Sequence, residues 1–160
     1  MQEDRAFIQL IKRHEGIIYK ITRLYADETE SQEDLYQEIV FQLWKGFKTF
    51  RGDAKISTWM YRVALNTALL HLKRKKRRGP RVSLDTIVLK QEEYDPLLEE
   101  RLKILYINIK KLGEVERGLI FLFLEGKKYK EIGSIIGLSA NNVGTRMARI
   151  KEKLRQYIKN

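Results

Sequence analysis

The chain contains no cysteine, which excludes disulfide bridges and thiolate metal sites. Its two histidines, His14 and His71, lie far apart in sequence and offer no metal cluster. Two prolines among 160 residues leave long stretches free to be helical. No apolar run approaches the roughly 20 residues of a membrane span, and the amino terminus lacks a signal peptide's basic start and apolar core. We therefore expect a soluble, cytoplasmic, all-α protein without membrane insertion and without a metal or other cofactor.

Charge, in contrast, is abundant and mostly of one sign, since 32 Lys and Arg against 21 Asp and Glu give a net charge of +11. Residues 56–83 carry 8 basic and no acidic side chains, whereas residues 84–100 carry 1 basic and 6 acidic ones. The last 60 residues hold 14 basic and 5 acidic side chains. Two positive blocks separated by an acidic one predict two contact surfaces for a polyanion.

The first half of the chain shows helical periodicity, with apolar residues recurring at intervals of three and four. The pattern predicts helices over 4–25, 32–46 and 57–75, which together make a three-helix domain. Ser31, followed by Asp34 three residues later, is predicted to cap the second of these helices.

The second half begins with a change of composition, from the basic run through Gly79-Pro80 to an acidic stretch. Residues 77–95 are therefore expected to form a flexible linker. Periodicity then resumes and predicts helices over 96–112, 114–125, 128–136 and 140–158. The chain is expected to form two small helical domains, 1–76 and 96–160.

The segment YKEIGSIIGLSANNVGTRMARIKEKL has the pattern of a helix-turn-helix. Gly133 allows two helices to approach closely, Gly137 permits a tight turn, and Ser139 is a good cap for the second helix. That helix has one apolar face. Its other face carries amide, hydroxyl and guanidinium groups suited to base edges and phosphates in a major groove: Asn142, Thr145, Arg146 and Arg149. The alternative is an ordinary helical hairpin with a solvated polar face.

A second segment, ISTWMYRVALNTALLHLKRKKRR, places an aromatic ring beside basic and amide groups on one side of a helix. This combination suits unpaired nucleotides, because rings stack on bases while cations hold phosphates. The residues on that side are Trp59, Arg62, Asn66 and Lys73. Trp59 and Tyr61 could equally be core residues, and the basic run 73–78 could be a solvated helix end. Six consecutive cations exceed what a helix end requires, which favours phosphate contacts.

A third segment, EDLYQEIVFQLW, predicts an amphipathic helix with an acidic polar face. It is either scaffold or a surface for a protein partner, since its carboxylates would repel phosphates. No segment shows a phosphate loop, a nucleophile with its base, or a pair of helix-borne histidines. The chain is therefore not expected to be an enzyme.

In this order the segments resemble conserved regions two and four of the extracytoplasmic-function (ECF) sigma factors, over nearly the whole chain. The resemblance implies an alternative sigma factor that binds bacterial core RNA polymerase and recognises and melts promoter DNA. An anti-sigma factor is a further partner common in the family.

The resemblance also implies residue roles. The clamp helices of the polymerase largest subunit would be bound by Asp34, Gln37, Glu38, Phe41 and Trp44. The minus-ten element and its melted non-template strand would be bound by Trp59, Tyr61, Arg62, Asn66, Lys73 and Arg74. The minus-thirty-five duplex would be read by Asn141, Asn142, Thr145, Arg146 and Arg149. The linker would thread towards the active-site and RNA-exit channel.

Some positions depart from the family pattern. Gly113 stands where proline is common, and Gly133 replaces the usual alanine. Gly144 and Ala148 lack the long side chains that often contact DNA at such positions. The base preferences of relatives therefore cannot be transferred to this chain.

Two other functions fit parts of the sequence. A conventional regulator would combine the helix-turn-helix with an amino-terminal sensing module, and would bind duplex DNA as a dimer without polymerase. An RNA-binding or architectural protein would use the two basic blocks without sequence preference. The segment from Trp59 to Asn66 and the linker spacing argue against the regulator.

Overall fold

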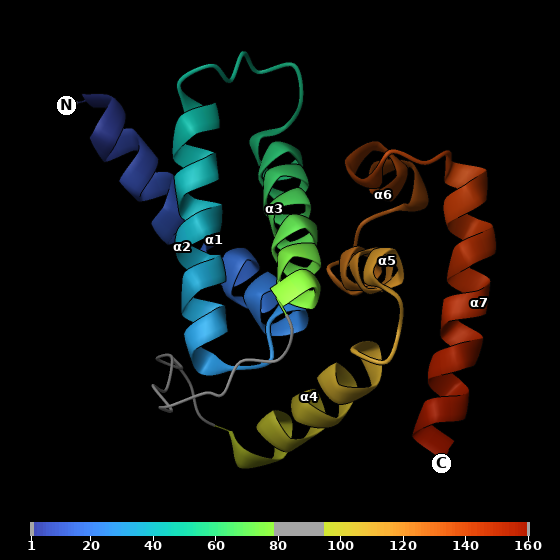
Figure 1. Cartoon of the computed structure of the whole chain (residues 1–160). Coiled ribbons are helices and arrows are strands. Elements are labelled where there is room, and N and C mark those ends of the chain that lie inside the picture. The colour runs from blue at the N-terminus through green and yellow to red at the C-terminus, as the bar shows by residue number, and fades with distance from the viewer. Residues whose placement is uncertain (1, 79–94, 160) are drawn as a thin grey trace. The chain divides into compact units, whose positions relative to one another are not determined.

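The computed structural model describes residues 2–78 and 95–159, and over these ranges the regular structure is entirely helical (Figure 1). The helices are α1 (Gln2–Tyr25), α2 (Thr29–Phe47), α3 (Ile56–Arg78), α4 (Pro96–Ile109), α5 (Glu114–Leu124), α6 (Tyr129–Ile136) and α7 (Ala140–Lys159). They belong to two compact units, unit 1 (Met1–Leu89) and unit 2 (Lys90–Asn160). The prediction of an all-α protein with two small helical domains is confirmed for the described ranges. Most of the predicted linker, residues 79–94, lies outside them.

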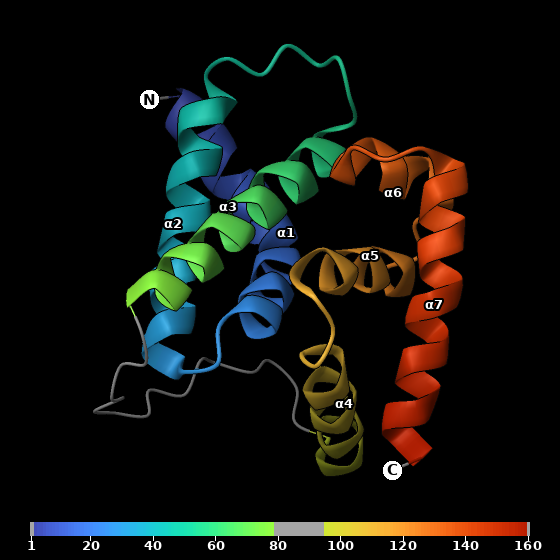
Figure 2. The ribbon, with the colours of Figure 1, turned by 45° about the vertical axis from the view of Figure 1, so that its right-hand side comes forward.

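Unit 1 is a three-helix arrangement in which α1, α2 and α3 all pack against one another (Figures 1 and 2). Each helix contributes a stripe of apolar residues at three- and four-residue spacing, as an amphipathic helix must to bury one face. The stripe is fully buried at Ile18 and Ile21 of α1, at Leu35, Ile39 and Leu43 of α2, and at Met60, Leu65 and Ala68 of α3.

α1 is interrupted at His14, whose backbone angles (φ −117°, ψ 17°) are not helical. The imidazole is half-buried at this kink. Burial lowers the pKa of His14, and the neighbouring charge of Arg13 lowers it further. Burial at the kink and the charge of Arg13 therefore favour the uncharged form of His14.

The prediction that Ser31 caps the second helix is wrong. α2 begins at Thr29, its N-cap is Glu28, and no side chain caps it. Ser31 lies inside the helix, where its Oγ is 3.3 Å from Nε2 of His71 on α3. Its hydroxyl is thus used between two helices, and a sequence pattern within one helix cannot reveal such a partner.

Unit 2 is built from α5, α6 and α7, which pack on one another, and from α4, which packs on α7. Figure 2 shows α7 running alongside the other helices of the unit. Its core contains Leu119 and Leu122 of α5, Ile132 of α6, and Val143, Met147 and Ile150 of α7. These contacts hold the two helices of the predicted helix-turn-helix against α5.

α4 ends at Ile109, three residues earlier than predicted. The N–H groups of Lys111 and Leu112 donate to the carbonyls three residues before them, and this geometry tightens the chain into a turn. The guanidinium of Arg117 on α5 donates to the carbonyls of Lys110 (2.8 Å) and Leu112 (3.2 Å). Arg117 thereby satisfies backbone acceptors that the end of α4 leaves without helical partners.

Within residues 2–78 and 95–159, none of the helices has both the length and the apolar content to cross a lipid bilayer.

Candidate nucleic-acid and polymerase interfaces

The turn between α6 and α7 has the geometry that the sequence predicts for a helix-turn-helix. Gly137 adopts a left-handed conformation (φ 92°), and the N–H groups of Gly137 and Leu138 donate to the carbonyl of Gly133 at 2.7 and 2.9 Å. A β-carbon on Gly133 would collide with the carbonyl oxygen of Leu138. Ser139 Oγ accepts from the N–H of Asn142 at 3.1 Å and so caps α7. The predictions for Gly133, Gly137 and Ser139 are confirmed.

α7 has two contrasting faces. Val143, Met147, Ile150 and Leu154 are buried. Exposed polar side chains occupy the rest of its first half and include all five predicted DNA-reading residues: Asn141, Asn142, Thr145, Arg146 and Arg149. Arg146 Nε donates to Asn142 Oδ1 at 2.8 Å, and the Thr145 hydroxyl donates to the carbonyl of Asn141 at 3.1 Å. The structure brings these groups together on one solvent-facing surface of unit 2.

Gly144 lies against the ring of Tyr129, the first residue of α6. A β-carbon on Gly144 would be 3.5 Å from the Tyr129 ring carbons, an ordinary contact distance. The Tyr129 ring also pairs with that of Phe123, with 6.3 Å between centroids. A side chain on Gly144 would therefore contact the Tyr129 ring beside α7. Tyr129 could not be identified from the sequence, because only the packing of α6 on α7 brings it beside Gly144.

On α3 the structure separates the predicted nucleotide-binding residues into two groups. Asn66 and Lys73 are exposed and Arg62 is half-buried. Tyr61, in contrast, is only 5% exposed and belongs to the core of unit 1. In this conformation its ring is not a surface for stacking bases.

Trp59 is half-buried against the end of α2. Its ring centroid is 5.1 Å from that of Phe50, and its Cζ2 lies 2.9 Å from where a β-carbon on Gly46 would stand. The glycine thus leaves room for the indole. Trp59 therefore packs within unit 1 while part of its side chain stays accessible, and its role in stacking on nucleotides stays a prediction.

A polar network between α2 and α3 was not expected from the sequence. Glu38 accepts from Arg74 NH1 at 2.8 Å through Oε1 and lies 3.2 Å from His71 Nδ1 through Oε2. The His71 side chain is 17% exposed and that of Arg74 58%. Glu38 and Arg74, for which the resemblance implies different partners, are therefore bonded to each other.

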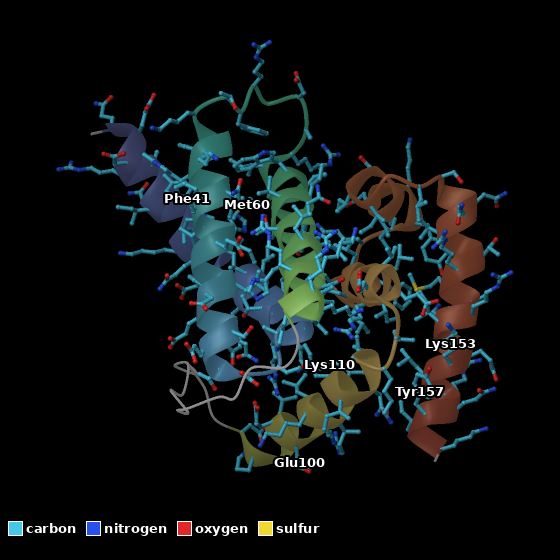
Figure 3. The ribbon with its side chains drawn as sticks, in the orientation of Figure 1. Phe41, Met60, Glu100, Lys110, Lys153 and Tyr157 are labelled. Carbon is cyan, nitrogen blue, oxygen red and sulfur yellow. The ribbon has the colours of Figure 1, made fainter. Side chains whose placement is uncertain are left out.

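The acidic face of α2 holds the remaining predicted polymerase-binding residues. Asp34, Gln37 and Phe41 are exposed, and Phe41, labelled in Figure 3, is 55% exposed although it is aromatic. Trp44 is half-buried, with its ring centroid 5.0 Å from that of Phe7 on α1. The amine of Lys48 lies 4.7 Å from the centre of the Trp44 ring.

Each unit of the chain matches a different family of protein domains. Residues 10–78 match sigma-70 region 2, and residues 109–154 match sigma-70 region 4. The ECF RNA polymerase sigma-E factor of Escherichia coli (strain K12) is 28% identical over 165 residues, covering 95% of this chain and 86% of the relative. The sigma-E factor of Haemophilus influenzae is 26% identical over 171 residues, covering 98% and 89%.

Two solved structures share the fold. CnrH, in complex with the cytosolic domain of CnrY, has a TM-score of 0.71 at 20% identity, covering 98% of this chain and 89% of that one. The sigma factor RpoE from Bartonella quintana, in complex with the anti-sigma factor NepR, has a TM-score of 0.75 at 17% identity, covering 97% and 98%.

Proposed function

The chain belongs to the ECF sigma factors, and we propose that different helices of it bind polymerase, the minus-ten element and the minus-thirty-five element. The protein is an alternative sigma factor that directs promoter recognition by bacterial RNA polymerase. The observation that carries the assignment of roles is the pairing of two surfaces. One is the exposed polar face of α7. The other is the face of α3 that carries Asn66 and Lys73, on a helix with no acidic residue. Both suit a polyanion, and each lies in its own unit.

Core polymerase binds α2. Asp34, Gln37 and Phe41 provide carboxylate, amide and aromatic groups on one exposed helix. An exposed aromatic residue beside polar groups is typical of the anchors that dominate protein interfaces. Trp44 supports this surface by packing on α1 and holds the helix in place for the clamp helices of the polymerase largest subunit.

The melted non-template strand of the minus-ten element binds α3. Arg62, Asn66 and Lys73 supply guanidinium, amide and ammonium groups for bases and phosphates. Trp59 contributes the exposed edge of its indole, and Tyr61 supports the helix from the core. The opening of DNA uses binding energy alone, so the protein needs no cofactor and hydrolyses no nucleotide.

The minus-thirty-five duplex binds α7, whose start enters the major groove. Asn141, Asn142, Thr145 and Arg146 lie in the first two turns, where a recognition helix reaches base edges. Arg149 follows one turn later and is placed for a base or phosphate. The bond between Asn142 and Arg146 preorganises two of these groups.

The organisation along the chain follows from these roles. Residues 1–76 act as the polymerase-binding and minus-ten domain, 77–95 as the linker, and 96–160 as the minus-thirty-five domain. The protein works in the cytoplasm, where polymerase and promoters are. An anti-sigma factor binds it in the absence of the inducing signal.

Three single variants separate the proposed roles in reconstituted transcription. Gln37→Ala is expected to weaken assembly with core polymerase, Asn66→Ala to weaken opening of the minus-ten element, and Arg149→Ala to weaken binding of the duplex. Arg155→Ala is the matched control for Arg149, because it removes an exposed arginine from another face of α7. Tight sequence-specific binding to duplex DNA without polymerase would instead identify a conventional regulator.

A further inference from the structure

The Glu38 network joins α2 and α3 through four side chains. The two oxygens of Glu38 serve Arg74 and His71, and the second ring nitrogen of His71 lies 3.3 Å from Ser31 Oγ. Ser31 and Glu38 are seven residues apart on α2, so they lie on one face of that helix. His71 and Arg74 are three residues apart on α3 and likewise share a face. The network therefore runs along the seam between the two helices.

The chemistry of the groups fixes most of the hydrogen-bond directions. A carboxylate only accepts, so Nδ1 of His71 must donate to Glu38. Nε2 then accepts from the Ser31 hydroxyl when the ring is neutral, or donates to Ser31 when it is protonated. The hydroxyl can rotate to suit either state, so the network is satisfied in both.

The arrangement distinguishes Arg74 from Lys73 and Arg77 of the basic run. Lys73 and Arg77 are four residues apart, both exposed, and lie on one side of α3. Arg74 is turned about 100° away from Lys73 at the spacing of an α-helix, towards α2. Its guanidinium already has a carboxylate partner at 2.8 Å. Arg74 could reach a phosphate only through its remaining N–H donors, and the Glu38 carboxylate that it already neutralises would repel that phosphate.

Building on the proposed function, we propose that Glu38, His71 and Arg74 are positioning residues for capture of the melted strand. They fix the basic end of α3 on α2, so that Lys73 and Arg77 project together towards the phosphates. Arg74 belongs to the basic run in sequence but is not one of its phosphate ligands.

Counterion release provides a direct test. The slope of log K against log salt is negative, and each phosphate contact that is lost makes it shallower by about 0.7 for a single strand. The double variant E38Q/R74Q removes one charge of each sign, so the net charge of the chain stays unchanged. K73Q is the comparison, because it removes a cation that the proposal places on the phosphates.

The experiment uses holoenzyme assembled from core polymerase and the full chain. Its probe is a single-stranded oligonucleotide with the non-template minus-ten sequence, titrated at several salt concentrations. We expect E38Q/R74Q to weaken binding roughly twofold to fivefold with the slope unchanged. K73Q is expected to make the slope shallower by about 0.7. An equal reduction in steepness for both variants would show that Arg74 binds phosphate and would overturn the proposal.

A charge swap tests the network independently of transcription. E38R and R74E should each lower the denaturant midpoint of the free protein, and E38R/R74E should recover part of the loss, because it restores the ion pair but gives His71 no acceptor. The tryptophan signal reports this transition, since Trp44 and Trp59 both lie in unit 1. A double variant no more stable than the singles would contradict the proposal. Failure of wild-type holoenzyme to bind the oligonucleotide more tightly than core alone would instead contradict the proposed function.

Discussion

At the residue scale, the position of the Trp59 ring depends on a glycine thirteen residues before it. Gly46 lies inside α2, where glycine weakens a helix by about 1 kcal/mol relative to alanine. Its position is explained by the indole, whose Cζ2 would be 2.9 Å from a β-carbon there. The glycine weakens the helix locally but leaves room for the indole beside α2 and Phe50.

Enlarging Gly46 should therefore displace Trp59. We expect Gly46→Val to lower the free energy of unfolding of unit 1 by about 1–3 kcal/mol, because overpacking forces the ring and its neighbours to shift. Denaturant unfolding followed by tryptophan fluorescence measures the loss. Gly16→Val is the matched control, since a β-carbon on Gly16 in α1 meets nothing within 4 Å. Equal losses at both positions would contradict the packing account of Gly46.

The second residue-scale prediction concerns His14 and pH. Burial, and then Arg13, lower the pKa of His14 in the folded protein below the ordinary value of 6.5. The unfolded chain therefore takes up this proton more readily than the folded one. The stability associated with His14 is fully present above pH 6.5 and is lost as the pH falls through the folded pKa.

Unfolding midpoints at pH 7.5 and 5.5 measure this effect. The wild type should lose more stability on acidification than His14→Gln, whose side chain does not titrate. Comparing the two proteins removes the contribution of the carboxylates, which both contain. If the loss of stability on acidification is the same in both proteins, the lowered pKa of His14 does not contribute to it, and the prediction is wrong.

At the element scale, Arg117 holds the corner between α4 and α5. Arg117→Ala should destabilise unit 2 by about 1–3 kcal/mol, because two backbone carbonyls lose a charged donor. Circular dichroism should show this unit melting earlier, while the tryptophan signal of unit 1 stays unchanged. Arg101→Ala, an exposed arginine on α4, serves as the control. A shift in the tryptophan transition would mean that the effect is not confined to unit 2.

Sequence reasoning succeeded where structure is decided within a few residues. Periodicity placed every helix of the described ranges, and the turn at Gly137 with its Ser139 cap followed from residue type and spacing alone. It failed where partners come from another helix. Ser31 was predicted to be a cap but bonds His71. For Tyr61 the sequence left a core position and a nucleotide-binding role both open, and the residue is buried.

The candidate site shows the same division. Exposure of Asn66 on α3 and of the polar face of α7 could be predicted from helical spacing. The bond between Glu38 and Arg74 could not, because the residues are 36 positions apart and each has a plausible surface role by itself. Tyr129 beside Gly144 was missed for the same reason, since only the packing of α6 on α7 brings them together.

At the scale of the whole molecule, the central claim is that two separate units address two parts of one promoter through polymerase. Each unit has its own core and its own basic surface. Phosphate contacts supply much of the affinity for DNA and weaken steeply with salt. Binding to isolated promoter DNA should therefore be weak at physiological salt, and polymerase should supply the additional affinity by holding both units at once.

The most direct test is transcription by core polymerase on pooled genomic promoters, with and without this protein, followed by sequencing of transcript starts. We predict new starts that share an upstream and a downstream element. Gln37→Ala should reduce all of them, whereas Arg149→Ala should reduce those with the weakest upstream element most. No new starts, together with tight sequence-specific binding to duplex DNA in the absence of polymerase, would contradict the account.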